Sequence, residues 1–384
     1  MRLALLALLA AGPAAADCGG DFASFRDAMR EEAVARGADP EAAARFFAAA
    51  RQDPRTLEAD RRQGVFQMPF VDFARRLISA NRMERGRQMA QRHDAVLDAV
   101  EETYGVSRGV LLAFWALETD YGAVQGDFRT LSSLVTLAHD CRRPELFRPQ
   151  VFAALELYER GGFALDTTGA WAGEIGQVQL LPEEILHRGV DADGDGAVTL
   201  KTSVPDALHT AGAVLRELGW RAGEPWLQEV SVPDGFDWSR SGLAGKRPVA
   251  DWAAMGVAPR WGALREDLEA ALIVPQGRGG PAFLAYPNFE VLFEWNESFV
   301  YVTTAAYLAT RLEGAPVFDA GSPEPGLDGA RMTRLQERLS ALGHDVGGID
   351  GILGARTRDA VRAEQARLGM AVDGWPTPAL LNAL

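Results

Sequence analysis

The helical spacing of apolar residues along most of the chain is the strongest constraint on its fold. Within residues 22–97 the apolar side chains recur at intervals of three and four. The same spacing continues in four later stretches: residues 110–121, 131–138, 151–158 and 289–312. Such spacing gives each helix one apolar face that must be buried, so the pattern predicts a mainly α fold.

Residues 221–286 break this pattern. They contain prolines, glycines and short extended runs such as residues 229–232 and 270–274. They also carry four tryptophans: Trp226, Trp238, Trp252 and Trp261. We expect a small insert with strands here, which makes the fold α+β.

The first residues have the composition of an export signal. Arg2 precedes an apolar run at residues 3–11, and Ala14 and Ala16 form an A-x-A cleavage pattern. We therefore expect a signal peptide at 1–16 and a mature protein in the periplasm. The run is too short for a permanent membrane span, and no later stretch has that length. Asp17 stands before Cys18, where lipid attachment needs a small residue, so we expect no lipid anchor.

Charge and cysteine content narrow the partners and the redox state. The formal net charge is -14, which argues against nucleic acid because phosphate binding needs a basic surface. The chain has two cysteines, Cys18 and Cys141. In an oxidising compartment an even pair predicts one disulfide, which would pin the mature amino terminus. The alternative is two unpaired thiols.

One acidic residue interrupts an apolar helix face. Leu111, Phe114 and Trp115 precede Glu118 by seven, four and three positions, so all four share one stripe of a helix that ends near Gly122. A carboxyl group partly removed from water favours its neutral form, which should raise its pKa. Glu118 is therefore a candidate general acid. The alternative is a glutamate paired with an arginine at a helix end.

Four ordered sequence blocks resemble the B-type lytic murein transglycosylases. Residues 118–122 are similar to that family's E-T-x-Y-G signature. Residues 171–182 resemble its A-G-x-x-G-x-x-Q-F-M-P segment, 191–196 its calcium loop, and 287–298 its P-N-F-x-x-I-x-x-Y-N-x-S segment. The resemblance covers residues 22–312 and implies a lysozyme-like helical catalytic domain over residues 17–312.

The resemblance also implies a chemistry. Glu118 would be a single acid/base that cleaves the bond between N-acetylmuramic acid and N-acetylglucosamine in peptidoglycan. The substrate's acetamido group would replace a second carboxylate, and the C6 hydroxyl would close a 1,6-anhydro ring without water. Two alternatives stay open: a lysozyme-like muramidase that uses water, and a non-catalytic protein that binds the wall. No organic cofactor is implied.

Supporting residues follow from the block positions. Gln179, Asn296 and Tyr121 would contact the glycan. The alternative for Gln179 is a buried structural glutamine, whereas Asn296 and Tyr121 could equally be ordinary core or cap residues. The chain departs from the family pattern at Ala170, where many relatives have serine, and at Trp295, where they have tyrosine. The loss of serine at Ala170 leaves the tuning of Glu118 open.

An acidic loop predicts one structural calcium ion. Asp191, Asp193 and Asp195 alternate, Gly196 permits a sharp turn, and Ala197 would offer its carbonyl oxygen. The resemblance implies that Asp206 supplies the closing carboxylate. The alternative is a solvated acidic turn without metal. The scattered histidines and two cysteines do not suggest zinc.

The last residues form a separate unit. Residues 313–326 are rich in glycine and proline and predict a flexible linker. Residues 327–384 carry two similar turns, Asp350-Gly351 and Asp373-Gly374, and resemble the small helical peptidoglycan-binding module. We expect three helices that anchor a monomeric enzyme to the wall; the alternative is a module for a protein partner.

Overall fold

The computed structural model describes residues 18–62 and 67–384, so the predicted signal peptide lies outside the described residues. The chain forms two compact units. The first comprises the chain up to Arg62 together with residues 124–207, and the second comprises residues 63–123 and 208–384. Among the described residues, no helix is long and apolar enough to cross a membrane.

The first unit is mainly helical. Its helices are α1 (Phe22–Ala35), α2 (Pro40–Ala49), α3 (Pro54–Arg61), α8 (Thr130–His139), α9 (Pro144–Glu159) and α10 (Pro182–Arg188). A two-stranded antiparallel ribbon joins β1 (Phe128–Arg129) to β2 (Thr168–Gly169). Helices α8 and α9 pack against each other. Leu134, Val135 and Val151 are completely buried on these two helices, which accounts for their helical apolar spacing.

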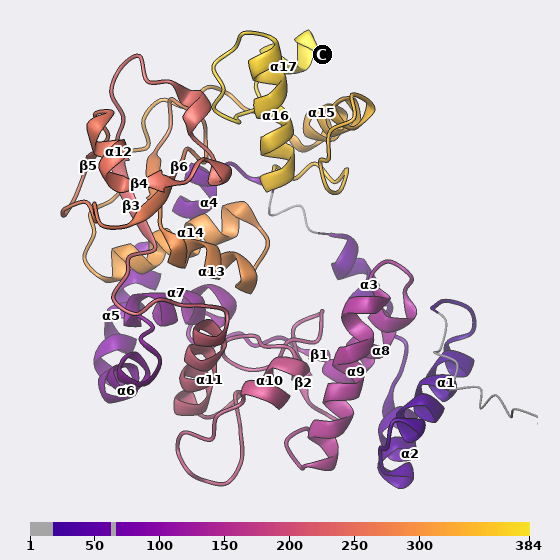
Figure 1. The fold of residues 1–384 in the computed structure, drawn as a ribbon. Helices are drawn as coiled ribbons and strands as arrows, with labels where there is room; N and C mark the ends of the chain where they lie inside the picture. Colours follow the sequence, from indigo (N-terminus) through magenta and orange to yellow (C-terminus); the bar gives the residue numbers. More distant parts are fainter. Residues whose placement is uncertain (1–17, 63–66) are drawn as a thin grey trace, which may run out of the picture. The chain divides into compact units, whose positions relative to one another are not determined.

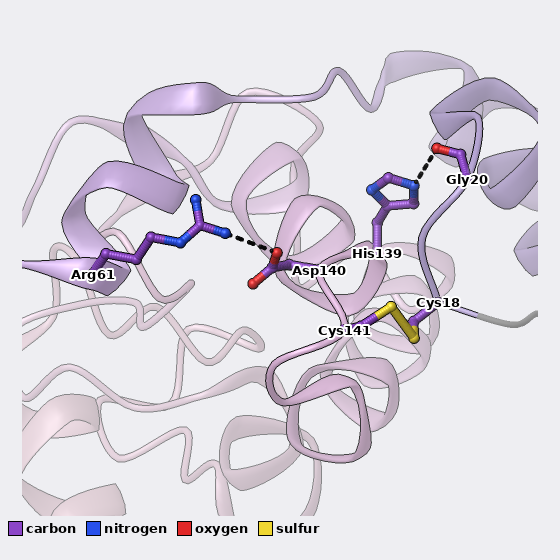
Figure 2. Close-up of a disulfide and its surroundings, with 6 residues drawn as sticks. All are labelled: Cys18, Gly20, Arg61, His139, Asp140 and Cys141. Carbon is purple, nitrogen blue, oxygen red and sulfur yellow. Dashed lines mark hydrogen bonds and ion pairs between the residues drawn. A yellow bond between two sulfur atoms is a disulfide. The ribbon is translucent and has the colours of Figure 1, made fainter. Parts of the chain in front are cut away.

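A disulfide ties the start of the described chain to this unit (Figure 2). It joins Cys18 to Cys141, whose Cα atoms are 5.2 Å apart. Beside it, the Gly19 N–H donates to the His139 carbonyl at 2.8 Å, and the His139 ring contacts the Gly20 carbonyl at 3.1 Å. The predicted disulfide is confirmed.

The second unit begins with a helical region. Its helices are α4 (Phe70–Leu77), α5 (Ala80–Arg92), α6 (Asp94–Tyr104), α7 (Arg108–Thr119), α13 (Pro287–Trp295) and α14 (Phe299–Leu312), and α11 (Val204–Glu217) leads into it. Helices α7 and α14 form the most extensive helix pair. Nearly every side chain of both is buried, so this pair is the core on which the candidate acid is mounted.

The insert contains a five-stranded antiparallel sheet (Figure 1). Its order is β4–β6–β7–β3–β5. The strands are β3 (Leu227–Ser231), β4 (Arg247–Pro248), β5 (Ala258–Pro259), β6 (Glu269–Ile273) and β7 (Ala282–Ala285), with α12 (Val249–Ala254) and two short 3-10 helices, η2 (Trp238–Arg240) and η3 (Leu243–Gly245). Leu272 and Leu284 pair across β6 and β7 and are completely buried, as is Trp252. The expected insert with strands is confirmed.

The carboxyl-terminal module has three helices, α15 (Gly329–Ala341), α16 (Ala355–Arg367) and α17 (Pro378–Ala383). Leu335, Leu339, Val361 and Leu380 are completely buried in its core.

The two Asp-Gly turns of this module are held by equivalent glutamines. Oε1 of Gln336 accepts the Gly351 N–H at 2.8 Å, and Oε1 of Gln365 accepts the Gly374 N–H at 2.8 Å. Both glutamines are buried. In each case a buried side-chain amide thus forms a hydrogen bond with a backbone N–H group of a tight turn.

Residues 313–326, the predicted linker, make hydrogen bonds and an ion pair with other parts of the second unit. The Ser322 N–H donates to the Gly279 carbonyl at 2.7 Å. Glu324 pairs with Arg278 at 2.8 Å through its side chain, and its carbonyl accepts the Trp375 indole N–H at 2.9 Å. The glycine and proline content indicated that this segment forms neither helix nor strand, but it could not show these tertiary hydrogen bonds.

Arg358 of α16 makes a further contact between the module and the rest of the second unit. It donates to the Pro275 carbonyl at 2.6 Å, and its guanidinium lies 4.3 Å from the ring centre of Phe299, the first residue of α14. Burial lowers the pKa of Arg358 to about 9. The guanidinium of Arg358 thus packs the module against the start of α14.

Candidate active site

Glu118 lies in the last turn of α7 and is half-buried. The helix begins at a Ser107 cap, whose hydroxyl accepts the Gly109 N–H at 3.1 Å. It ends because Asp120 and Tyr121 adopt left-handed backbone angles, φ 51° and 60°. Such angles cost a non-glycine residue on the order of 1–3 kcal/mol and cluster at functional sites. The strained turn fixes the direction of the Glu118 backbone.

Two aromatic side chains donate hydrogen bonds to the same oxygen of Glu118. The Tyr301 hydroxyl bonds Oε1, and the Trp295 indole N–H donates to Oε1 at 3.3 Å. The Trp295 ring also stacks on Phe114, with ring centres 4.5 Å apart. The predicted carboxylate on an apolar face is therefore present, and donors from α13 and α14 hold it.

Trp295 explains one departure from the family pattern. The sequence predicted the loss of a tyrosine hydroxyl at this position, but the indole supplies its own N–H donor and a larger ring. Its stacking on Phe114, one turn before Glu118, holds that donor in place. The substitution keeps a polar contact to the acid.

Sequence reasoning missed Tyr301. Burial first, and then the charge of Glu118, raise the pKa of the Tyr301 hydroxyl well above its usual value, so it remains a proton donor over any working pH. The available signal was its place three residues after Ser298, whose hydroxyl caps α14 by accepting the Tyr301 N–H at 3.4 Å. The cap marks where α14 begins, but only the fold shows which side chain of α7 it meets.

Asp120 points to other partners. Its carboxylate pairs with Arg85 and lies 3.3 Å from Nε of Arg82, both on α5. Its backbone carbonyl also accepts from Arg85 at 3.0 Å. These arginines hold Asp120 in an ion-pair network, as expected of a residue that is not a second catalytic carboxylate.

Two of the three expected glycan contacts have structural partners in the second unit. Tyr121 is only 6% exposed, and its hydroxyl donates to the Arg82 carbonyl at 3.1 Å. Burial raises its pKa to about 12. Tyr121 thus fits the alternative of a core residue better than that of a groove-lining one. Asn296 is half-buried, and its side-chain oxygen accepts the Ser298 N–H at 2.9 Å, which orders the turn before α14.

Gln179 belongs to the first unit. It sits in a tight turn closed by a bridge between Ile175 and Leu180, with a left-handed backbone angle of φ 52°. Its amide donates to the Gly176 carbonyl at 2.7 Å, and it is half-buried. A strained, partly accessible amide is compatible with substrate binding. Ala170 lies nearby in sequence and offers no hydroxyl.

The acidic loop brings three of the predicted metal ligands together in the first unit. Carboxylate oxygens of Asp191, Asp193 and Asp206 lie within 4.8 Å of one another. Gly196 has φ 92°, which permits the predicted turn. The side chain of Asp195 is outside this group and accepts the Ala197 N–H at 2.9 Å.

Asp206 is the buried member of this cluster. It is completely buried, and its two oxygens accept the N–H groups of Ala192 at 2.9 Å and Thr199 at 2.8 Å. The resemblance pointed to Asp206 at this place. A buried carboxylate beside two exposed ones is a hard oxygen donor set that fits a calcium ion.

Comparison with known proteins gives the family. The transglycosylase SLT domain matches residues 21–310, and a putative peptidoglycan-binding domain matches residues 328–384. A comparison with curated proteins yields no match.

Among solved structures, SltB3 from Pseudomonas aeruginosa in complex with NAG-anhNAM-pentapeptide is 37% identical, with a TM-score of 0.87 over 95% of this chain and 99% of that one. The Escherichia coli lytic transglycosylase Slt35 in complex with calcium is 22% identical, with a TM-score of 0.66 over 78% of this chain and 96% of that one; it shows the fold alone. The chain therefore belongs to the transglycosylase SLT family and is a peptidoglycan lytic transglycosylase with a carboxyl-terminal peptidoglycan-binding domain.

Proposed function

We propose that Glu118 is the single acid/base of this enzyme and that it cleaves the β-1,4 bond between N-acetylmuramic acid and N-acetylglucosamine. The observation that carries the proposal is the pair of aromatic donors on Oε1 of Glu118. A half-buried acid held in this way can release a proton and then be stabilised as a carboxylate. Asp120, the acidic residue nearest in sequence, is held by Arg82 and Arg85.

The reaction then runs in two steps. Glu118 protonates the glycosidic oxygen while the substrate's acetamido oxygen attacks C1, so the C1–O bond breaks and N-acetylglucosamine leaves. The Glu118 carboxylate next takes the C6 hydroxyl proton, and that oxygen attacks C1 as the acetamido oxygen departs. The product is a 1,6-anhydro ring, Glu118 is protonated again, and no water is consumed.

A relative's ligands support this assignment. SltB3 has been crystallised with NAG-NAM-pentapeptide and with NAG-anhNAM-pentapeptide. This chain is 37% identical to SltB3 over 95% of its length. We therefore propose that it acts on the same class of substrate and forms the same anhydro product. Gln179 and Asn296 would contact the sugars, whereas Tyr121 would support the strained turn after α7.

We also propose a structural calcium ion on Asp191, Asp193 and Asp206. When bound, calcium would neutralise this acidic cluster and fix the loop. Asp195 and the Ala197 carbonyl would complete the shell only if the loop tightened, because the Asp195 side chain lies outside the cluster. We further propose that the protein is exported to the periplasm, because its first residues resemble a signal peptide. We propose that it acts there as a monomer.

Isotope labelling of the products tests the proposed reaction. Purified sacculi are digested in H2(18)O, and the muropeptides are analysed by mass spectrometry. The proposal predicts anhydro ends without the heavy isotope. A muramidase would instead yield reducing ends that carry one (18)O, and a wall-binding protein without activity would release no soluble fragments.

A further inference from the structure

A pocket in the second unit lies at the opposite end of the α7–α14 pair from Glu118. The two helices run antiparallel: Glu118 meets Tyr301 at one end, and Ser107 contacts Glu313 at the other. Both Ser107 and Glu313 line a pocket of about 470 Å³. The helical rise of 1.5 Å per residue places this pocket ~16 Å from the acid along α7. It is therefore distinct from the catalytic carboxylate.

The walls of this pocket are aromatic. Trp226 and Tyr307 are buried, and Trp261 stands at the rim with 51% of its surface exposed. Such an exposed tryptophan is unusual in a chain whose other large aromatic side chains are mostly buried. Aromatic faces attract both aliphatic chains and cations.

The rim is preorganised. The Gln228 amide donates to the carbonyls of Trp261 and Ala263, each at 3.0 Å. Arg265 follows in the same loop and donates to the Gly223 carbonyl at 3.1 Å. These bonds fix the loop that carries Trp261, so little ordering cost remains for a ligand.

Carboxylates dominate the charge of the lining. Four line the pocket, whereas Arg265 is the single basic side chain among the described lining residues. The carboxylates belong to Glu101, Glu224, Glu229 and Glu313.

Glu224 has an ion-pair partner, Arg221, but its buried oxygen accepts no hydrogen bond. Its Oε2 is buried without a hydrogen-bond donor, and Nη1 of Arg221 is 3.7 Å away. A buried carboxylate oxygen that is ion-paired but accepts no hydrogen bond gains from a donor such as an ammonium group. Four carboxylates against one arginine in the described lining disfavour an anionic ligand.

We propose that this pocket binds a primary ammonium group at the end of an aliphatic chain, chemically the side chain of a diamino acid. The source of this ammonium group that we infer is the free amine of a peptidoglycan stem peptide; this part of the inference rests on the proposed function. The chain would lie against Trp226 and Trp261, and the ammonium would face Glu224 and Glu313. The pocket would thus select strands by their peptides, apart from the acid that cuts the glycan.

Titration calorimetry with 1,5-diaminopentane tests the pocket on the full-length protein, with 1,5-pentanediol as the neutral probe of matched length. We expect saturable binding of the diamine and none of the diol. Trp261→Ala and Glu313→Gln should each weaken the diamine about fivefold, from the loss of a cation–π contact or of one charge. Glu102→Gln removes an exposed carboxylate that does not line the pocket and should leave binding unchanged.

Three results would overturn the proposal: absent diamine binding at millimolar concentration, equal binding of the diol, or equal affinity in the Trp261→Ala and Glu102→Gln proteins. Binding of chitotriose that Trp261→Ala abolishes, without diamine binding, would assign the pocket to sugar and also refute it. Sacculus digestion by the same proteins separates the two proposals. Normal digestion without diamine binding refutes the pocket alone, and diamine binding without anhydro products refutes the proposed reaction alone.

Discussion

Removing the Tyr301 hydroxyl should change the pH dependence of cleavage. In Tyr301→Phe, Oε1 of Glu118 loses the hydroxyl donor and keeps the Trp295 N–H at 3.3 Å. A hydrogen bond to a charged group contributes about 1.5–3 kcal/mol. Its loss disfavours the ionised carboxylate, so the protonated acid persists to higher pH. At 1.36 kcal/mol per pH unit, the alkaline limb of the profile should move up by about one to two units.

The assay is the initial rate of anhydromuropeptide release from sacculi, measured from about pH 4 to about pH 9. Normal and perturbed carboxyl groups titrate within this range. The sign is fixed because Tyr301 itself does not titrate there: burial and the Glu118 charge keep its pKa far above the assay range.

Tyr307→Phe is the matched control. Tyr307 is another buried tyrosine of α14, and its hydroxyl accepts the Phe318 N–H at 3.1 Å instead of contacting the acid. It should lower stability without moving the profile. A Tyr301→Phe profile that overlays the wild type would refute the reasoning, because Glu118 would then not be the titrating acid or would not depend on this bond.

Three further results are expected. Arg358→Ala in the full chain should reduce the rate of sacculus cleavage several-fold, because it removes the contact that holds Phe299 at the start of α14. The control Arg356→Ala, at a 67% exposed position, should leave the rate unchanged. Equal rates in the two variants would contradict a coupling between the module and α14. Cys141→Ser should lower the free energy of unfolding by roughly 2–5 kcal/mol in urea titration, since the disulfide closes a loop of 123 residues. A calcium chelator should lower the melting temperature of the wild type but not of Asp206→Asn; an equal effect on both would argue against the metal site.

The sequence predicted the helices, the insert with strands and the place of Glu118 on an apolar helix face because each depends on local pattern. Glu118 was recognisable as a candidate because its neighbours at three and four positions are aromatic, and the resemblance of residues 118–122 to the family signature favoured it as the acid. The disulfide was likewise predictable, since two cysteines allow one pairing.

What the sequence could not predict depends on tertiary packing. Tyr301 lies 183 positions from Glu118, and nothing local to either residue indicates that α7 and α14 pack antiparallel. The contacts of Arg358 were equally unpredictable from sequence, because its partners Pro275 and Phe299 belong to other segments. The glycine and proline content of residues 313–326 predicted a tether, but bonds made elsewhere in the fold decide whether such a segment moves.

The most direct test of the central claim is mass spectrometry of sacculi digested by Glu118→Gln. This change keeps the size of the side chain and removes the proton that the reaction needs. We predict that the variant binds sacculi as the wild type does and releases no anhydromuropeptides, while Glu297→Gln, an exposed neighbour in sequence of Trp295, digests normally. Release of anhydromuropeptides by Glu118→Gln at the wild-type rate would contradict the account.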